Sequence, residues 1–135
     1  MVKDDGGQTV VLGPRGETWA VATDFDDDCD TDILAGNGGY VYLLENIGDA
    51  EKGQFAAPRR LTKADGTTID MGYWSGAPAF KDMNGDGLKD LLLSEWDGTL
   101  TPLSLFINIG TSTEPAFAEP RVLLRTLGGS GISFI

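Results

Sequence analysis

The chain has 135 residues, of which 21 are acidic and 10 are basic, so its formal charge is −11 at neutral pH. That charge repels phosphate backbones and anionic lipid head groups, which excludes nucleic acids and membrane surfaces as expected partners. The chain contains no histidine and a single cysteine, which excludes histidine-based nucleophilic triads and an internal disulfide. No apolar run approaches the roughly 20 residues of a membrane span, and membrane insertion is not expected.

The composition favours many short strands. Nineteen glycines and six prolines separate brief apolar runs rich in valine, isoleucine, leucine and aromatic residues, a pattern typical of strands joined by tight turns. The N-terminal residues MVKDDGGQTV lack the apolar run of a signal peptide. We therefore expect an all-β chain, and we expect any export signal to lie outside it.

Two similar segments follow each other along the chain. The first extends over about residues 17–62 with an acidic loop at 24–32, and the second over about 74–124 with an acidic loop at 82–90. In the second segment, turn residues separate short apolar runs, which predicts strands at 76–81, 90–94, 103–108 and 120–124. Four short strands in about 60 residues are typical of one propeller blade.

The similarity between the segments is clearest after the acidic loops. Residues 46–61 and 108–123 are identical at eight of sixteen positions at an offset of 62, whereas the acidic loops align at an offset of 58. The four additional residues of the second copy are expected to lengthen a hairpin loop near 99–103. The identical pairs are Asn46 and Asn108, Ile47 and Ile109, Gly48 and Gly110, Phe55 and Phe117, Ala56 and Ala118, Pro58 and Pro120, Arg59 and Arg121, and Leu61 and Leu123.

This repeat predicts two four-stranded antiparallel blades of a β-propeller, with residues 1–135 forming a partial propeller. Two blades cannot close a ring that needs about four to eight, and their outer faces would remain apolar and unpaired. We therefore expect a fragment of a propeller with about six to eight blades, or assembly with other copies of the chain. The residues before 17 and the tail 125–135 are expected to belong to neighbouring blades.

Both acidic loops place oxygen-bearing side chains at their first, third, fifth and ninth positions. Alternating carboxylates in a tight turn suit one hard cation, and the main-chain carbonyl of the seventh residue can complete the shell. Zinc prefers nitrogen and sulfur ligands and magnesium needs a stricter octahedron, so calcium is the expected ion. The predicted ligands are Asp24, Asp26, Asp28, Asp30 and Asp32 in the first loop, and Asp82, Asn84, Asp86, Leu88 and Asp90 in the second.

Two alternatives compete with a propeller-type calcium loop. An EF-hand is disfavoured because the twelfth position holds Ala35 or Leu93 instead of glutamate, and an apolar strand-like run follows each loop. A solvated Asx-rich turn without metal remains open. The second loop has glycine at the sixth position where the first has Cys29, so we expect calcium to bind the second loop first. Without the glutamate, binding should be weak, on the order of 10⁻⁴ to 10⁻³ M.

The string D-M-N-G-D-G-L-K-D-L-L-L at 82–93, followed by N-I-G and F-A-E-P, resembles the FG-GAP and VCBS-type repeats. Such repeats build β-propellers in integrin α-chains, in bacterial surface proteins and, similarly, in rhamnogalacturonan lyases. The resemblance covers about residues 17–125 and implies calcium ligands at the acidic positions given above. Neither copy has the Phe-Gly pair of the integrin version, so the chain resembles the VCBS-like branch more closely.

The resemblance implies an extracellular or cell-surface scaffold for binding or adhesion, with a protein or polysaccharide ligand. The alternative is part of a calcium-dependent polysaccharide lyase, although the sequence identifies no catalytic residue and an enzyme is the less favoured interpretation. Aromatic residues either stack on sugar rings or pack between blades. These residues are Trp19, Trp74, Trp96, Tyr40, Tyr42 and Tyr73.

Overall fold

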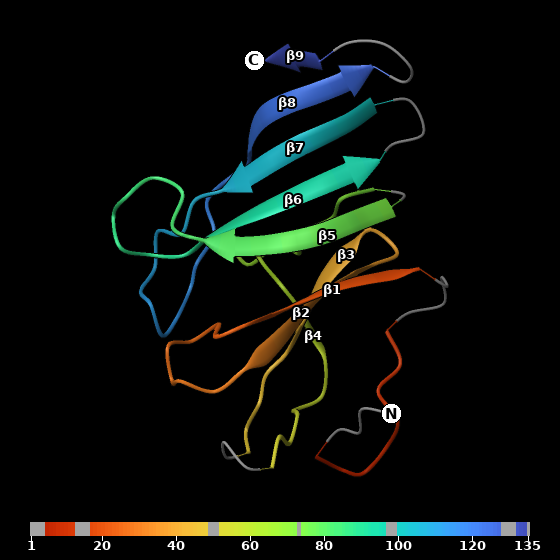
Figure 1. Cartoon of the computed structure of the whole chain (residues 1–135), viewed down its shortest axis with the longest axis vertical. Helices are drawn as coiled ribbons and strands as arrows, with labels where there is room; N and C mark the ends of the chain where they lie inside the picture. Colours follow the sequence, from red (N-terminus) through yellow and green to blue (C-terminus); the bar gives the residue numbers. More distant parts are fainter. Residues whose placement is uncertain are drawn as a thin grey trace.

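The computed structural model describes residues 5–12, 17–48, 52–72, 74–96, 100–127 and 132–134. Two antiparallel sheets pack against each other, and the strands follow in chain order within each sheet (Figure 1). Among the described residues, no helix is long and apolar enough to span a membrane. Blade one contains β1 (Thr18–Thr23), β2 (Asp32–Asn37), β3 (Tyr40–Leu44) and β4 (Arg59–Arg60). Blade two contains β5 (Trp74–Lys81), β6 (Asp90–Trp96), β7 (Leu100–Phe106), β8 (Arg121–Leu127) and β9 (Ile132–Phe134).

The all-β class and the division into two antiparallel blades are confirmed, with one correction at the C-terminus. We expected the tail 125–135 to belong to a neighbouring blade, but β8 continues to Leu127 and β9 then pairs with it. Arg125 lies opposite Ser133 in that pair. The tail therefore adds a fifth strand to blade two, because pairing satisfies the backbone groups that β8 would otherwise expose at a sheet edge.

The additional residues of the second copy lengthen two strands and the connection between their paired parts. Gly38 and Gly39 connect β2 to β3, whereas three residues, 97–99, which lie outside the described part, separate β6 from β7. Of the four additional residues, Trp96, Leu100 and Thr101 are in strands. These residues pair with the outer strands: Trp96 lies opposite Trp74 of β5, and Leu100 and Thr101 lie opposite Leu127 and Thr126 of β8. The ladder between β6 and β7 ends at Ser94 and Leu103, so the predicted longer connection is present between these two residues.

The main core lies between the two blades. We call the face of blade one that carries Leu34, Val41 and Leu43 its forward face, and these side chains are all 0% exposed. They pack against the opposite, rear face of blade two, where the buried residues are Leu91, Leu93 and Phe106. Burying each such side chain stabilises the fold by about 1.5–3 kcal/mol.

An aromatic group extends the same core toward the acidic loops. The rings of Phe25 and Phe80 stack with centroids 5.0 Å apart, and Phe117 meets the Phe80 ring at 6.2 Å edge-on. Phe25 comes from the first loop and Phe80 from β5. The first loop is therefore anchored in the packing between the blades.

The connector before blade two fills the space between the two blades. Before blade two, the amides of Ile69 and Met71 bond to the carbonyl oxygens of Leu61 and Gly39 at 3.0 and 2.7 Å, and both side chains are buried in the main core. The sequence T-I-D-M-G at 68–72 matches T-V-V-L-G at 9–13. The repeat thus begins earlier than residue 17.

The earlier connector occupies the equivalent place on blade one. Val10 and Leu12 pack against a second apolar cluster of Ala35, Tyr42 and Leu44, which lies on the rear face of blade one. Because Val10 matches Ile69 and Leu12 matches Met71, both connectors contribute two apolar side chains to the rear face of the blade that follows.

Candidate metal centre

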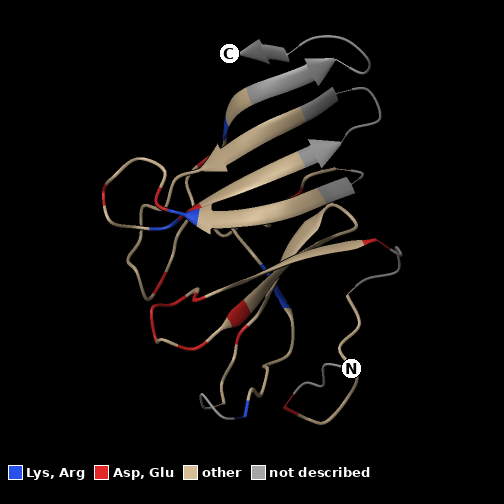
Figure 2. Cartoon of the chain, in the orientation of Figure 1, with Lys and Arg blue, Asp and Glu red and all other residues tan. Residues whose placement is uncertain are grey.

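The two acidic loops project from the same side of the molecule (Figure 1). Loop one, 24–32, joins β1 to β2, and loop two, 82–90, joins β5 to β6. Figure 2 shows that acidic residues run along most of loop one. Strands flank both loops, which confirms that neither loop is an EF-hand.

Each loop is wound around its first aspartate. In loop one, the Asp24 carboxylate accepts hydrogen bonds from the amides of Asp27 and Cys29 at 2.7 and 3.3 Å. In loop two, the Asp82 carboxylate accepts the amides of Gly85 and Gly87 at 2.7 and 2.9 Å. The same amides lower the pKa of Asp82, because they stabilise its charged form.

This winding requires a left-handed backbone at the fourth and sixth positions. Gly85 and Gly87 have φ of 85° and 90°, and Asp27 and Cys29 adopt φ of 64° and 72° at the same places. Left-handed backbone is costly for residues with a Cβ, although aspartate tolerates it better than most. Cys29 thus adopts the left-handed backbone for which glycine is favoured at the sixth position, and the same requirement at the fourth position was not predicted.

The aspartate at the ninth position of each loop anchors the loop to the sheet. Asp32 is 1% exposed, and its two carboxylate oxygens accept the amides of Phe25 and Asn46, both at 2.7 Å. Asp90 is 0% exposed and accepts the amides of Met83 and Asn108, both at 2.9 Å. Besides its predicted role as a ligand, this residue therefore satisfies two backbone donors that would otherwise be buried and unpaired.

The asparagine of the N-I-G string extends the same network. The Asn108 side-chain oxygen accepts the amides of Gly110 and Ala116 at 2.9 and 3.1 Å. In blade one, the Asn46 oxygen accepts the amides of Gly48 and Gln54, both at 3.1 Å. The identity of Asn46 and Asn108 is visible in the sequence, but the sequence indicated no role for these residues. In the structure, each asparagine closes the turn that follows the third strand of its blade, next to the aspartate at the ninth position of the loop.

Three carboxylates converge in loop one. One oxygen each of Asp24, Asp26 and Asp28 lies within 4.8 Å of the others. Oδ1 of Asp26 is buried and has no hydrogen-bond partner. Burial raises the pKa of Asp26, and the charges of Asp28, Asp32 and Glu45 raise it further. A buried carboxylate oxygen without a donor, beside like charges, is a place where a cation would be stabilising.

Loop two satisfies more of its polar groups internally. The side-chain Nδ2 of Asn84 donates to Asp86 Oδ2 at 2.8 Å, and the side-chain Oδ1 of Asn84 accepts the main-chain amide of Asp86 at 2.9 Å. The Asp86 carboxylate also accepts the amide of Leu88 at 2.8 Å, as Asp28 accepts that of Asp30 at 2.8 Å. Among the described residues, the convergence of three carboxylates is found in loop one and not in loop two. The ligand set of each loop and the order of binding stay predictions.

Comparison with known proteins agrees with this arrangement. A family model described as FG-GAP-like repeat matches residues 24–93, which are 70 of the 135 residues. The chain belongs to this family. A search of curated proteins and a search of solved structures each found no match. The FG-GAP-like match begins at the first aspartate of loop one and ends within β6, so it spans both loops, and membership in the VCBS-like branch stays a prediction.

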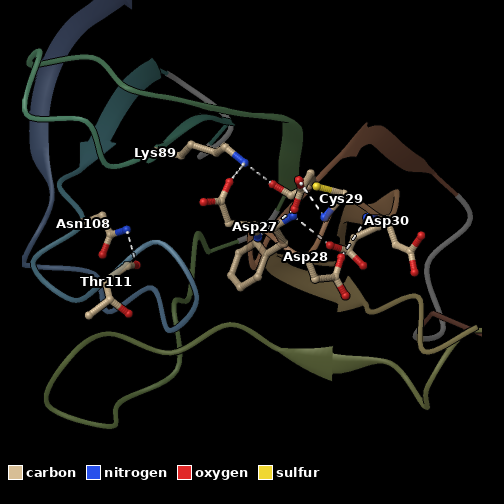
Figure 3. A network of polar contacts seen from close by, with 10 residues as sticks. Asp27, Asp28, Cys29, Asp30, Lys89, Asn108 and Thr111 are labelled. Carbon is tan, nitrogen blue, oxygen red and sulfur yellow. Dashed lines mark hydrogen bonds and ion pairs between the residues drawn. The ribbon is translucent and has the colours of Figure 1, made fainter. Parts of the chain in front are cut away.

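One basic residue joins the two FG-GAP-like loops. Nζ of Lys89, in loop two, donates to the main-chain oxygen of Asp24 at 2.6 Å and lies 3.7 Å from the Asp27 carboxylate (Figure 3). Nothing in the repeat pattern indicated this contact, because it joins residues 65 positions apart. Loop one is therefore held by a cation from the neighbouring blade at its first turn.

The aromatic residues divide between packing and exposure. The Arg60 guanidinium lies 3.9 Å from the Tyr40 ring centroid and 5.8 Å from that of Tyr42, so both tyrosines are covered by their own blade. Trp19 is 55% exposed on β1. Tyr73 and the side chains of Trp74 and Trp96 lie outside the described part of the structure.

Proposed function

We propose that this FG-GAP-like chain binds calcium through its acidic loops and serves, as part of a propeller, as an extracellular scaffold for binding or adhesion. The observation that carries the calcium proposal is the convergence of Asp24, Asp26 and Asp28, with one oxygen of Asp26 buried and without a donor. The chain provides no nitrogen or sulfur cluster among these residues, and calcium prefers oxygen ligands.

The loop-one residues fit a calcium ion by the chemistry of their donors. The carboxylates of Asp24, Asp26 and Asp28 would hold the ion, with the Asp30 carbonyl and Asp32 completing the shell of oxygens. A bound ion would offset the repulsion that raises the pKa of Asp26. In loop two the corresponding donors are the side chains of Asp82, Asn84, Asp86 and Asp90 with the carbonyl of Leu88.

An extracellular location follows from the expected affinity. Calcium loops without a bidentate glutamate belong with the extracellular modules that bind on the order of 10⁻⁴ to 10⁻³ M. Such loops are filled only where calcium is abundant, and filling them would reduce the charge of −11. A rigid rim of filled loops would then present a protein or polysaccharide ligand with a fixed surface.

Titration calorimetry with Ca²⁺ tests the metal proposal, with Mg²⁺ as the comparison ion. We expect Asp26→Ala to abolish or weaken one binding event by at least about tenfold, since it removes the carboxylate oxygen that lacks a donor. Asp86→Ala should weaken the other event. Asp30→Ala is the matched control, because its predicted ligand is a main-chain carbonyl that the substitution retains.

Two results would contradict the proposal. One is an unchanged heat profile for Asp26→Ala and Asp86→Ala relative to the wild-type chain, and the other is equal binding of Mg²⁺ and Ca²⁺. If the loops are metal-free Asx-rich turns, no saturable heat appears at all. Thermal unfolding of each variant without calcium separates a lost ligand from a lost fold.

A further inference from the structure

The forward face of blade two is apolar and more exposed than its counterpart on blade one. Phe25 of blade one is 3% exposed, and the equivalent residue of blade two, Met83, is 47% exposed. Leu34, Val41 and Leu43 are all 0% exposed. Of their equivalents, Leu92 and Leu103 are half-buried and Leu105 is 9% exposed. The apolar positions that hold the two blades together are thus repeated on blade two, where Met83, Leu92 and Leu103 are less covered than their counterparts on blade one.

The rear face of blade one has the complementary character. In the internal interface, the rear face of blade two receives the forward face of blade one over the connector residues Ile69 and Met71. The rear face of blade one carries the matching connector residues Val10 and Leu12 on its own apolar cluster. On blade one the cluster residues Ala35, Tyr42 and Leu44 are buried and the connector residues Val10 and Leu12 above them are half-buried. A forward face and a connector-covered rear face, the two kinds of surface that meet in the internal interface, are therefore both present outside that interface.

We propose that a second copy of this chain docks the rear face of its blade one onto the open forward face of blade two, repeating the internal interface. The contact joins different surfaces of the two copies, so it is head-to-tail and each copy retains one free half for the next. Continued addition gives a ring when the rotation closes and a row when it does not. This proposal is independent of calcium binding.

The charges next to the interface fit this docking. Inside the chain, Lys89 compensates loop one by contacting the Asp24 carbonyl and the Asp27 carboxylate. In the proposed contact between two copies, Thr31 of one copy takes the place of Lys89, and Gly85 of the other copy takes the place of Asp27. The ammonium and the carboxylate are replaced together, so docking leaves neither member of this ion pair without the other.

Sedimentation velocity of the wild-type chain across a concentration series tests the proposal. We expect concentration-dependent association that Met83→Asp weakens by at least about tenfold, because docking would bury the new carboxylate. Ile47→Asp is the control, since Ile47 is 48% exposed, nearly the same as Met83 at 47%. Its repeat equivalent Ile109 stays 61% exposed beside the internal interface, so Ile47→Asp should leave association unchanged.

A mixing experiment tests the head-to-tail geometry. Val10→Asp should block the rear face of blade one, whereas Val11→Asp should not, because Val11 is 76% exposed and its repeat equivalent is Asp70. Val10→Asp and Met83→Asp each retain one intact half of the interface. Each variant alone should be monomeric, and an equimolar mixture should form a one-to-one complex and nothing larger.

Three outcomes would overturn the docking proposal. They are a wild-type chain that remains monomeric up to about 1 mM, equal weakening by Met83→Asp and Ile47→Asp, and an equimolar mixture that remains monomeric. A monomer at that concentration would mean that something other than a second copy covers the open face. Thermal unfolding of Val10→Asp and Met83→Asp shows whether each variant is folded, and the one-to-one complex cannot form from unfolded chains.

Discussion

The ammonium of Lys89 and the main-chain oxygen of Asp24 are 2.6 Å apart, and this hydrogen bond ties the acidic loop of one blade to that of the next. The same ammonium lies 3.7 Å from the Asp27 carboxylate. A cation supplied by the neighbouring blade therefore stabilises the turn that holds the converging carboxylates of loop one. Blade packing and the geometry of the candidate metal centre are linked through one side chain.

Removal of this ammonium should loosen the contact between the blades. We expect Lys89→Met, which keeps most of the alkyl chain, to lower the free energy of unfolding by about 1 kcal/mol, because solvent screens a side chain that is 35% exposed. Urea unfolding without calcium measures the change. Lys81→Met removes the same charge from an exposed position at the end of β5 and should change stability by less than about 0.5 kcal/mol.

Asp90, at the ninth position of loop two, should be needed for stability whether or not calcium is present. Asp90→Ala leaves the buried amide of Asn108 and the partly buried amide of Met83 without acceptors. We expect a loss of about 2 kcal/mol, because a buried unpaired donor costs about 1–3 kcal/mol and a partly buried one costs less. Asp30→Ala should change stability by less than about 0.5 kcal/mol. Thermal unfolding in EDTA measures both, and a stable Asp90→Ala chain would contradict the proposed structural role.

Replacing Cys29 by glycine should raise the free energy of unfolding. Cys29 adopts φ of 72°, where its counterpart Gly87 adopts 90°, so Cys29→Gly should stabilise the chain by about 0.5–1 kcal/mol in denaturant unfolding. Gly87→Ala, which puts a Cβ on a left-handed residue, should destabilise it by about 1 kcal/mol. Opposite signs for this pair are the expected result, and a loss of stability in Cys29→Gly would be inconsistent with strain at this position.

The lowered pKa of Asp65 should depend on the hydrogen bonds that Thr67 donates. The hydroxyl and amide of Thr67 donate to Asp65 Oδ1 at 2.6 and 2.9 Å and lower the pKa of Asp65. A lowered folded-state pKa contributes stability above the unfolded-state value, and this contribution is lost as the pH falls through the folded-state pKa. In Thr67→Val the Asp65 pKa should rise toward its ordinary value, as measured by NMR titration. An unchanged pKa would assign the shift to another donor.

The sequence by itself determined the repeat, the strand class and the position of both acidic loops. The spacing of the loop aspartates and the N-I-G string each lie within a short stretch of chain, and interactions within that stretch explain them. Alternating aspartates wind a tight turn around their own amides, and Gly48 is required because a Cβ there would lie 2.2 Å from the Lys52 carbonyl oxygen. Such features are readable without knowing which segments meet in space.

Only the tertiary structure decided which surfaces meet. The equivalence of Phe25 and Met83 is visible in the sequence, but Phe25 is buried against Phe80 of the neighbouring blade and Met83 is exposed. Likewise, Lys89 and Thr31 occupy the same loop position, and only the placement of the blades brings Lys89 to Asp24. Burial and charge pairing between distant segments depend on the arrangement of the sheets, which a local pattern does not specify.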